Sequence, residues 1–300
     1  MMERADMFSC SVSVALILGV LANIIMAGGA IPPVIPEPQV TPLTAGAIIY
    51  LPGEVQPSAQ LVYQGQPSES TLRIAFTFDS GWIFEYTPAL LDILRDQGVA
   101  ATFFHRGKWA EANPELVKRI IAEGHLIGNH SYTHPYMDKL SPAQVSEEIE
   151  LADQALEKLT GYKPWLYRPP YGSCTPAVRQ ALAERGYTHS IMWTIDSHDW
   201  MDPGVQYIID RVTKNAKDGA IVLMHVGAPQ TIEALPSIIE WLRNKDYEFV
   251  LLDDLLPHIA AADGRIPYRV REGDTLENVA LKFQVSEDEI LALNPYISNN

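Results

Sequence analysis

LRIAFTFDSG occupies residues 72–81 and opens the regular part of the chain. Its first seven residues form a short apolar run that is typical of a buried strand, and the run ends at Asp79. Six similar runs follow at 99–104, 125–129, 165–168, 187–195, 220–224 and 248–252. Because helical stretches separate these runs, the pattern predicts an α/β fold of about seven parallel strands, most simply a distorted (β/α) barrel.

The helical stretches between the runs cover 88–97, 114–123, 142–159, 176–185, 204–217 and 232–243. The longest of them has clear boundary signals. Ser141 stands at the position of an N-cap, and Gly161 follows the last periodic residue. These signals predict a helix that begins at Pro142 and ends before Gly161.

The composition is that of a globular protein, with 47% hydrophobic and 20% charged residues among 300. That length accommodates one catalytic domain and a small additional module. The formal net charge is −15, which argues against a nucleic-acid partner because phosphate binding depends on Lys and Arg. We therefore expect a globular protein that does not bind nucleic acid.

Residues 1–30 have the order of a targeting segment: Arg4, an apolar run at 12–26, and then small residues. Both a cleaved signal peptide and a retained membrane anchor fit this order, and both predict export. The protein would then be secreted, associated with the cell wall, or anchored to the outer face of the membrane, with no other membrane contact. Residues 31–70 are expected to form a Pro-rich linker and an irregular lead-in.

Ionisable side chains follow the strand-like runs at the points where the runs end. The set comprises Asp79, His130, His134, Arg168, Asp196, Asp199 and His225. In parallel α/β folds the carboxyl ends of the strands meet at one face, where active sites are built. The sequence therefore predicts that these side chains converge.

His130 and His134 are four residues apart, and on a helical turn both imidazoles would face one way and bind one divalent metal. Such an ion polarises an amide carbonyl and lowers the pKa of water. Amide hydrolysis also needs a base and an acid, for which Asp79 and His225 are the candidates. Arg168 is placed to hold the Asp79 carboxylate ionised, as a bidentate guanidinium does well.

Five motifs resemble those of the carbohydrate esterase family 4 polysaccharide deacetylases, the NodB-homology domain. They are TFDSG (77–81), GHLIGNHSYTH (124–134), RPPYG (168–172), DSHDW (196–200) and LMH (223–225), in the order of the family. The resemblance covers residues 71–256 and implies a distorted (β/α) barrel. It also implies a metal-dependent hydrolase that removes N-acetyl groups from amino sugars of a polysaccharide.

The resemblance implies a role for each matching residue. Asp79 would be the catalytic base, oriented by Arg168, and His225 the catalytic acid, with Asp199 as its partner. His130 and His134 would be metal ligands, and the backbone N–H of Tyr171 would donate to the oxyanion. Trp200 and Leu223 would line the acetyl pocket. Trp82, after the first motif, is a further candidate for stacking on a sugar ring.

One position departs from the family pattern. Ser80 stands where the family usually has a second aspartate, the third ligand of a divalent ion, with zinc the expected metal. A neutral hydroxyl is a far poorer ligand than a carboxylate. Another group could complete the shell, the affinity could fall, or catalysis could be lost; since Asp79, His225 and Arg168 remain, we favour an active enzyme.

Residues 268–300 resemble a LysM module, which binds glycans that contain N-acetylglucosamine. YRVREGDTLENVA (268–280) and LNP (293–295) carry this resemblance, and 257–267 would be the linker. The closing strand of the family does not follow before residue 300, so a partial βαα module is expected. The module indicates the same substrate class as the catalytic domain.

The leading hypothesis is thus an exported deacetylase that acts on peptidoglycan or a chitin-like polymer and releases acetate. A protein that binds the cell-wall glycan but has impaired catalysis is the alternative, prompted by Ser80. A glycoside hydrolase would need two carboxyl groups that flank the glycosidic bond. The histidine pair beside Asp79 favours a metal site instead.

Overall fold

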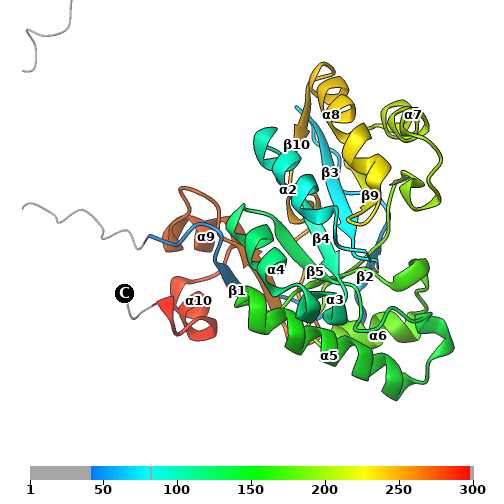
Figure 1. The fold of residues 1–300 in the computed structure, drawn as a ribbon. Coiled ribbons are helices and arrows are strands. Elements are labelled where there is room, and N and C mark those ends of the chain that lie inside the picture. Colours follow the sequence, from blue (N-terminus) through cyan, green and yellow to red (C-terminus); the bar gives the residue numbers. More distant parts are fainter. Residues whose placement is uncertain (1–41, 82, 298–300) are drawn as a thin grey trace, which may run out of the picture. The chain divides into compact units, whose positions relative to one another are not determined.

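The computed structural model describes residues 42–81 and 83–297 of the chain (Figure 1). Within this part, nine strands form a sheet in the order β2-β7-β6-β5-β4-β3-β9-β8, with β10 beside the start of β3. All pairs in this sheet are parallel. The α/β class predicted from the sequence is confirmed.

The strands of this sheet are β2 (Gln60–Val62), β3 (Leu72–Asp79), β4 (Thr102–His105), β5 (Leu126–Asn129), β6 (Leu166–Tyr167), β7 (His189–Ile191), β8 (Ile195–Asp196), β9 (Ala220–His225) and β10 (Tyr247–Phe249). The α-helices that alternate with them are α2 (Thr87–Asp96), α3 (Gly107–Ala112), α4 (Pro114–Ala122), α5 (Pro142–Thr160), α6 (Pro176–Glu184), α7 (Val205–Asn215) and α8 (Pro229–Arg243). Short 3₁₀ turns are η1 (Met137–Lys139), η2 (Pro170–Gly172), η3 (Asp199–Met201) and η4 (Leu252–Leu255).

Helix α5 has the boundaries that its sequence signals predict. The Ser141 side chain accepts a hydrogen bond from the Gln144 N–H, and the Gln144 side chain returns one to the Ser141 N–H, which is a capping box. At the other end Gly161 adopts a left-handed φ of 78°, a conformation that glycine reaches without strain. Local chemistry alone therefore places the longest helix.

The run at 187–195, predicted as one strand, is two strands. β7 pairs with β2 and β6, whereas β8 pairs with β9 at the opposite end of the sheet order. Only three residues separate Ile191 from Ile195, and so short a segment spans roughly 14 Å at most. The sheet must therefore curl until its two ends approach each other, as in a distorted barrel.

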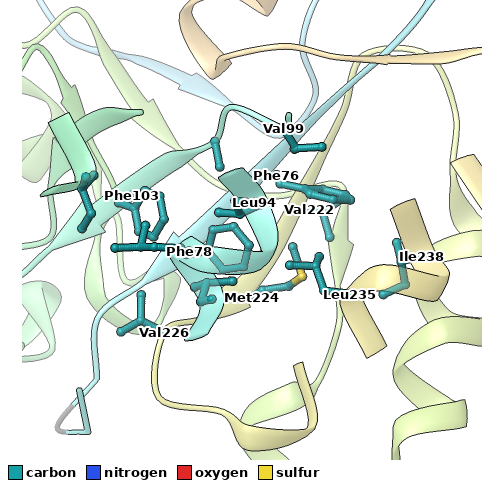
Figure 2. Packing of buried hydrophobic residues seen from close by; sticks show 14 of the residues in the cluster. Phe76, Phe78, Leu94, Val99, Phe103, Val222, Met224, Val226, Leu235 and Ile238 are labelled. Atoms are coloured by element: carbon teal, nitrogen blue, oxygen red, sulfur yellow. The ribbon is translucent and has the colours of Figure 1, made fainter. Parts of the chain in front are cut away.

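Apolar side chains fill the space between the sheet and the helices α2 and α8. Phe76 and Phe78 of β3 point into this cluster, where they meet Val222 and Met224 of the neighbouring strand β9 (Figure 2). These residues are at most 1% exposed. Burial of so much apolar surface fixes the position of β3, whose last residue is Asp79.

A second, two-stranded sheet lies outside the barrel. Its strands are β1 (Ile48–Pro52) and β11 (Arg265–Arg269), which pair antiparallel, and the helices α9 (Leu276–Phe283) and α10 (Glu287–Leu293) follow β11. The ranges predicted as irregular lead-in and linker therefore need correction, because 31–70 contains β1 and β2 and 257–267 contains the start of β11. Alternation of half-buried and buried side chains along β1, which is typical of a strand, explains the first correction.

No helix in residues 42–81 and 83–297 combines the length and apolar character needed to cross a bilayer. The predicted signal peptide or anchor at 1–30 lies outside these residues. It stays a prediction.

Candidate active site

The candidate residues gather at the carboxyl ends of four parallel strands. Asp79 ends β3 and lies in register with His225, which ends β9. His130 directly follows β5, and Arg168 directly follows β6. The structure thus brings these four side chains to one edge of the sheet, as the sequence predicts.

Asp79 and Arg168 form a buried ion pair. The Arg168 Nη1 donates to Asp79 Oδ1 at 2.8 Å, and the two residues are 0% and 4% exposed. Burial alone would raise the pKa of Asp79, but the charge of Arg168 and its hydrogen bond hold the pKa below its ordinary value. Asp79 is therefore ionised at neutral pH, as a general base must be.

The guanidinium of Arg168 divides its hydrogen bonds among several acceptors. Nη1 also donates to Thr77 Oγ1 at 2.9 Å, and Nη2 donates to the Met192 carbonyl at 3.1 Å. The predicted bidentate contact with Asp79 is therefore absent, because Nη2 is held by the main chain after β7. The central carbon of the Arg168 guanidinium, Cζ, lies 4.3 Å from the centre of the Phe104 ring, which adds a cation–π contact.

The two candidate metal ligands converge. His130 Nε2 and His134 Nε2 are 3.1 Å apart, and His130 Nδ1 is 2.7 Å from the Arg168 carbonyl. A proton on Nδ1 that is donated to this carbonyl leaves the Nε2 lone pair free for a metal. Burial lowers the pKa of both histidines, that of His134 to about 3, so both are neutral ligands at pH 7.

The His130–His134 segment is not the helical turn that its spacing suggested. Ser131 and His134 have left-handed φ values of 63° and 71°. Asn129 Oδ1 accepts the Ser131 N–H at 2.7 Å, and Ser131 Oγ accepts the His134 N–H at 3.0 Å. Local side-chain to backbone bonds of this kind compete with helix formation, and here they direct both imidazoles to one point.

Glu148, on α5, holds the middle of this loop. Its Oε2 accepts the N–H groups of Tyr132 and Thr133 at 3.0 and 2.8 Å, and its Oε1 accepts the Thr133 hydroxyl at 2.6 Å. Charge-assisted bonds from consecutive backbone donors are strong and directional. Glu148 is therefore a positioning residue for His130 and His134.

Replacing Glu148 by Ala should weaken the binding of a divalent metal ion by about 10- to 100-fold, because partners that orient metal-binding loops contribute about that much to affinity. Competition with a chromogenic chelator would measure the change. Glu148→Gln keeps one acceptor oxygen and should lie between the wild type and Glu148→Ala. Glu147→Ala is the matched control, since this neighbour is exposed on the same helix. Equal affinities for the two alanine variants would refute the assignment.

Ser80, the departure from the family pattern, is buried between β3 and β4. It is 1% exposed, and its Oγ accepts the Arg106 N–H at 2.9 Å. In residues 42–81 and 83–297 no group of three His, Cys, Asp or Glu side chains is arranged to hold a metal. The described residues thus fit a cation through two imidazole nitrogens, without a third protein ligand of those types.

His225 is oriented by Asp199, as the resemblance implied. His225 Nδ1 lies 2.7 Å from Asp199 Oδ1, while Asp199 Oδ2 accepts the His225 N–H at 2.7 Å and the Thr231 hydroxyl at 2.6 Å. Burial lowers the pKa of His225, but the hydrogen bond and charge of Asp199 outweigh it and raise the pKa above its ordinary value. The imidazole therefore keeps its proton up to a higher pH than an ordinary histidine does.

An open cleft of about 460 Å³ adjoins His225 and Asp199. Its wall includes Trp200, which is 60% exposed and is thus available to a ligand. Leu223 is 4% exposed and lies within β9, in register with Thr77. Trp82 lies outside the described residues, and its predicted contact with sugar stays a prediction.

Tyr171 has a left-handed backbone, with φ 58° and ψ 13°. This conformation is strained for a residue other than glycine, and such strain is concentrated at functional sites. Its side chain stacks on Tyr136 with ring centres 4.0 Å apart and meets the His134 ring edge-on at 4.5 Å. The two tyrosines form an exposed aromatic surface beside the histidine pair.

Sequence reasoning missed four residues that support this site: Thr77, Asn129, Glu148 and Thr231. Two of them carried a local signal, since Thr77 and Asn129 lie within two residues of Asp79 and His130. Glu148 and Thr231 are on helices α5 and α8, and their contacts arise only from tertiary packing.

Two family models match separate parts of the chain, the barrel and the segment after it. Residues 67–190 match the family model of polysaccharide deacetylase, and residues 268–300 match that of the LysM domain. A peptidoglycan-N-acetylglucosamine deacetylase of Bacillus cereus is 38% identical over 208 residues, which are 68% of this chain and 96% of that protein. The uncharacterized protein YlxY of Bacillus subtilis is 36% identical over 68% of this chain and 65% of its own length, just under two thirds.

A solved structure of similar fold is that of BA3943, described as a CE4 family pseudoenzyme from Bacillus anthracis. It has a TM-score of 0.63 and 34% identity, and the match covers 67% of this chain and 70% of that chain. A mutant of BA3943 with restored enzymatic activity has also been solved. The similar proteins thus include both a deacetylase and a pseudoenzyme.

Proposed function

The chain belongs to the polysaccharide deacetylase family, and from this membership we propose that it is a hydrolase that removes N-acetyl groups from amino sugars of peptidoglycan. The observation that carries the proposal is the juxtaposition of an ionised Asp79, a neutral histidine pair and the Asp199-bound His225 at one edge of the sheet. Hydrolysis of an amide needs these three functions in one place.

Asp79 is the proposed general base. Arg168 keeps its carboxylate charged and fixed, so Asp79 accepts a proton from the water that attacks the acetyl carbon. The buried, water-poor surroundings of the pair strengthen this electrostatic control. Arg168 itself acts by positioning Asp79.

His225 is the proposed general acid. Asp199 engages Nδ1, which leaves Nε2 to give a proton to the amine of the sugar as the C–N bond breaks. The products are acetate and a glycan with a free amine. The backbone N–H of Tyr171 is the proposed donor to the oxyanion.

The polysaccharide deacetylase family is metal-dependent, and the residues of this site could hold a divalent ion. We infer that this ion is zinc. His130 and His134 would hold it through Nε2, since imidazole is a common zinc ligand. A bound ion of this kind polarises an amide carbonyl and lowers the pKa of water. Ser80 supplies no charge to such a site.

We propose that the protein is exported and acts at the cell wall. Three observations support this: the targeting pattern at 1–30, the LysM match at 268–300, and the similarity to a peptidoglycan deacetylase. The glycan partner is then the N-acetylated cell-wall polymer. A membrane contact is proposed only for the N-terminal segment.

Acetate release from peptidoglycan and from an N-acetylglucosamine oligomer tests this function. The full chain is assayed after chelation and again after zinc is added back. Acetate that disappears with the chelator and returns with zinc supports the deacetylase. A folded protein that binds the glycan but releases no acetate with any divalent ion would instead be a non-catalytic wall-binding protein, the second candidate, which the neutral Ser80 favours.

Restoring the family carboxylate distinguishes these two candidates further. Ser80→Asp should tighten zinc binding by roughly an order of magnitude or more, because a carboxylate is a far better ligand than a hydroxyl. Isothermal titration with zinc would measure the change, and Ser80→Asn, of similar size but neutral, is the control. Equal affinities for Ser80→Asp and Ser80→Asn would mean that position 80 does not face the cation.

A further inference from the structure

The module that follows the barrel contains only one strand of its own among its described residues. β11 is followed directly by α9 and α10. A single strand leaves the N–H and C=O groups of both edges without partners, which is unfavourable beside an apolar core. The structure therefore has to satisfy these groups from elsewhere in the chain.

The partner is β1, which precedes the entire barrel in the sequence. β1 and β11 pair antiparallel over five residues each, from Ile48 opposite Arg269 to Pro52 opposite Arg265. The pairing continues beyond the strands. Val270 donates to the Ala47 carbonyl at 2.8 Å, and Gly46 donates to the Val270 carbonyl at 2.9 Å.

The outer edge of β1 is also covered by the module. Asn294, which is 0% exposed and follows α10, accepts the Tyr50 N–H through Oδ1 at 2.8 Å and donates from Nδ2 to the Tyr50 carbonyl at 2.6 Å. The Tyr296 hydroxyl donates to the Ile48 carbonyl at 2.7 Å. The side chain of Asn294 thus does what a third strand would do.

Side chains from segments before and after the barrel share one apolar core. Ile49 and Leu51 of β1 are 1% and 0% exposed. They pack in one cluster with Tyr268, Val270, Leu276, Val279, Ala280 and Ile290. Removing β1 would expose this cluster to water, so the module is complete only with its N-terminal strand.

We propose that the deacetylase domain is inserted into the LysM module, whose second strand is β1, and that the glycan site of the module is built from segments on both sides of the deacetylase domain. A groove of about 260 Å³ lies between the segment that contains β1 and the module that follows the barrel. Pro42, Leu43, Thr44, Ala47 and Ile49 line it from the N-terminal side, and Val270, Tyr296 and Ile297 from the C-terminal side.

The chemistry of the groove fits an N-acetylated sugar. Its walls are mainly apolar, and the Tyr296 ring, 51% exposed, offers a face on which the CH groups of a pyranose can pack. The LysM match includes Val270, Tyr296 and Ile297, which line the groove. We therefore infer that the groove binds a glycan. The identity of this ligand rests on the proposed function, whereas the strand pairing does not.

The strand pairing is tested first, in the full chain with Cys10 and Cys174 replaced by Ser. Pro52→Cys with Arg265→Cys places two thiols at paired positions, where opposite residues of antiparallel strands are close enough for a disulfide. Mild oxidation should link the two tryptic peptides, as detected by mass spectrometry. Pro52→Cys with Glu272→Cys is the control, because these positions are not paired. No link in the first variant would overturn the insertion.

The composite glycan site is tested by retention on insoluble peptidoglycan, with His225→Ala added to every variant to prevent turnover. Thr44→Arg puts a long side chain into the groove from the N-terminal side, and Tyr296→Ala removes the aromatic face. Each should weaken retention at least fivefold. Ala45→Arg is the matched control, since Ala45 is exposed, next in sequence and outside the groove.

Acetate release from a soluble oligomer separates this proposal from the proposed function. Thr44→Arg, in the chain with His225 intact, should keep the wild-type rate because Thr44 is not in the catalytic cleft. If Thr44→Arg is retained on peptidoglycan as well as Ala45→Arg, the composite site is refuted even when the enzyme is active. Loss of retention with Tyr296→Ala alone would assign the site to the C-terminal residues and refute the N-terminal contribution.

Discussion

Replacing His225 by Ala should lower kcat/KM for deacetylation by about 10²- to 10⁴-fold, the contribution expected of a general acid. The affinity of the protein for a divalent metal ion should not change, because His225 hydrogen-bonds to Asp199 and is not one of the converging imidazoles. Acetate release and metal titration of the same sample test both parts. Loss of that affinity in this variant would show that the ligands are assigned wrongly.

His198→Asn serves as the matched control for this variant. His198 lies next to Asp199 in sequence, but its ring contacts Tyr207 and Arg211. Asn tolerates the left-handed backbone of this position, where φ is 60°. The control should retain nearly the wild-type rate, so that a general loss of histidine near the cleft does not explain the result.

The pH profile gives an independent readout of the same acid. His225 must be protonated to act, and its pKa lies above the ordinary value of 6.5, so the rate should fall as the pH rises through this raised pKa. Asp199→Asn removes the charge that raises this pKa. The alkaline limb of kcat/KM should then move to lower pH, and an unmoved limb would exclude His225 as the titrating group.

Replacing Arg168 by Met should lower the free energy of unfolding by about 3–5 kcal/mol, because it leaves the Asp79 carboxylate buried without its cation. Loss of the Arg168 charge would also raise the pKa of Asp79, which the pair now holds down. The acid limb of the rate should therefore move to higher pH. Urea denaturation and a pH–rate profile measure the two effects.

Two control variants distinguish the effect of losing the Arg168 charge from other effects of replacing an arginine. Arg168→Lys keeps the charge but not the planar fork, so it should recover part of the pH shift and less of the stability. Arg179→Met removes a guanidinium from helix α6, away from Asp79. Equal destabilisation by Arg168→Met and Arg179→Met would mean that the ion pair with Asp79 contributes little.

The sequence could predict the strands and the gathering of the candidate residues because both follow from short-range patterns. Apolar runs that end in Asp79, His130, Arg168 and His225 determine which side chains reach the carboxyl edge of a parallel sheet. The family motifs lie on the same runs. Both kinds of signal are local, so they survive without knowledge of the tertiary packing.

The remaining features depend on contacts between distant residues. The His130–His134 spacing allowed a helical turn, but bonds from Asn129 and from Glu148 on α5 impose a loop. The strand β1 was predicted as part of an irregular lead-in because its partner lies beyond the barrel in sequence. A pattern read along the chain contains no information about such partners.

The pairing of β1 with β11 also sets the order in which the chain can acquire its structure. During synthesis β1 emerges before the barrel, but its partner strand is made only after the barrel is complete. Closing so large a loop has an entropic cost, which favours folding of the barrel before the module. The LysM module should therefore be the last part to fold, and any chain released before β11 is made would carry the barrel without a complete LysM module.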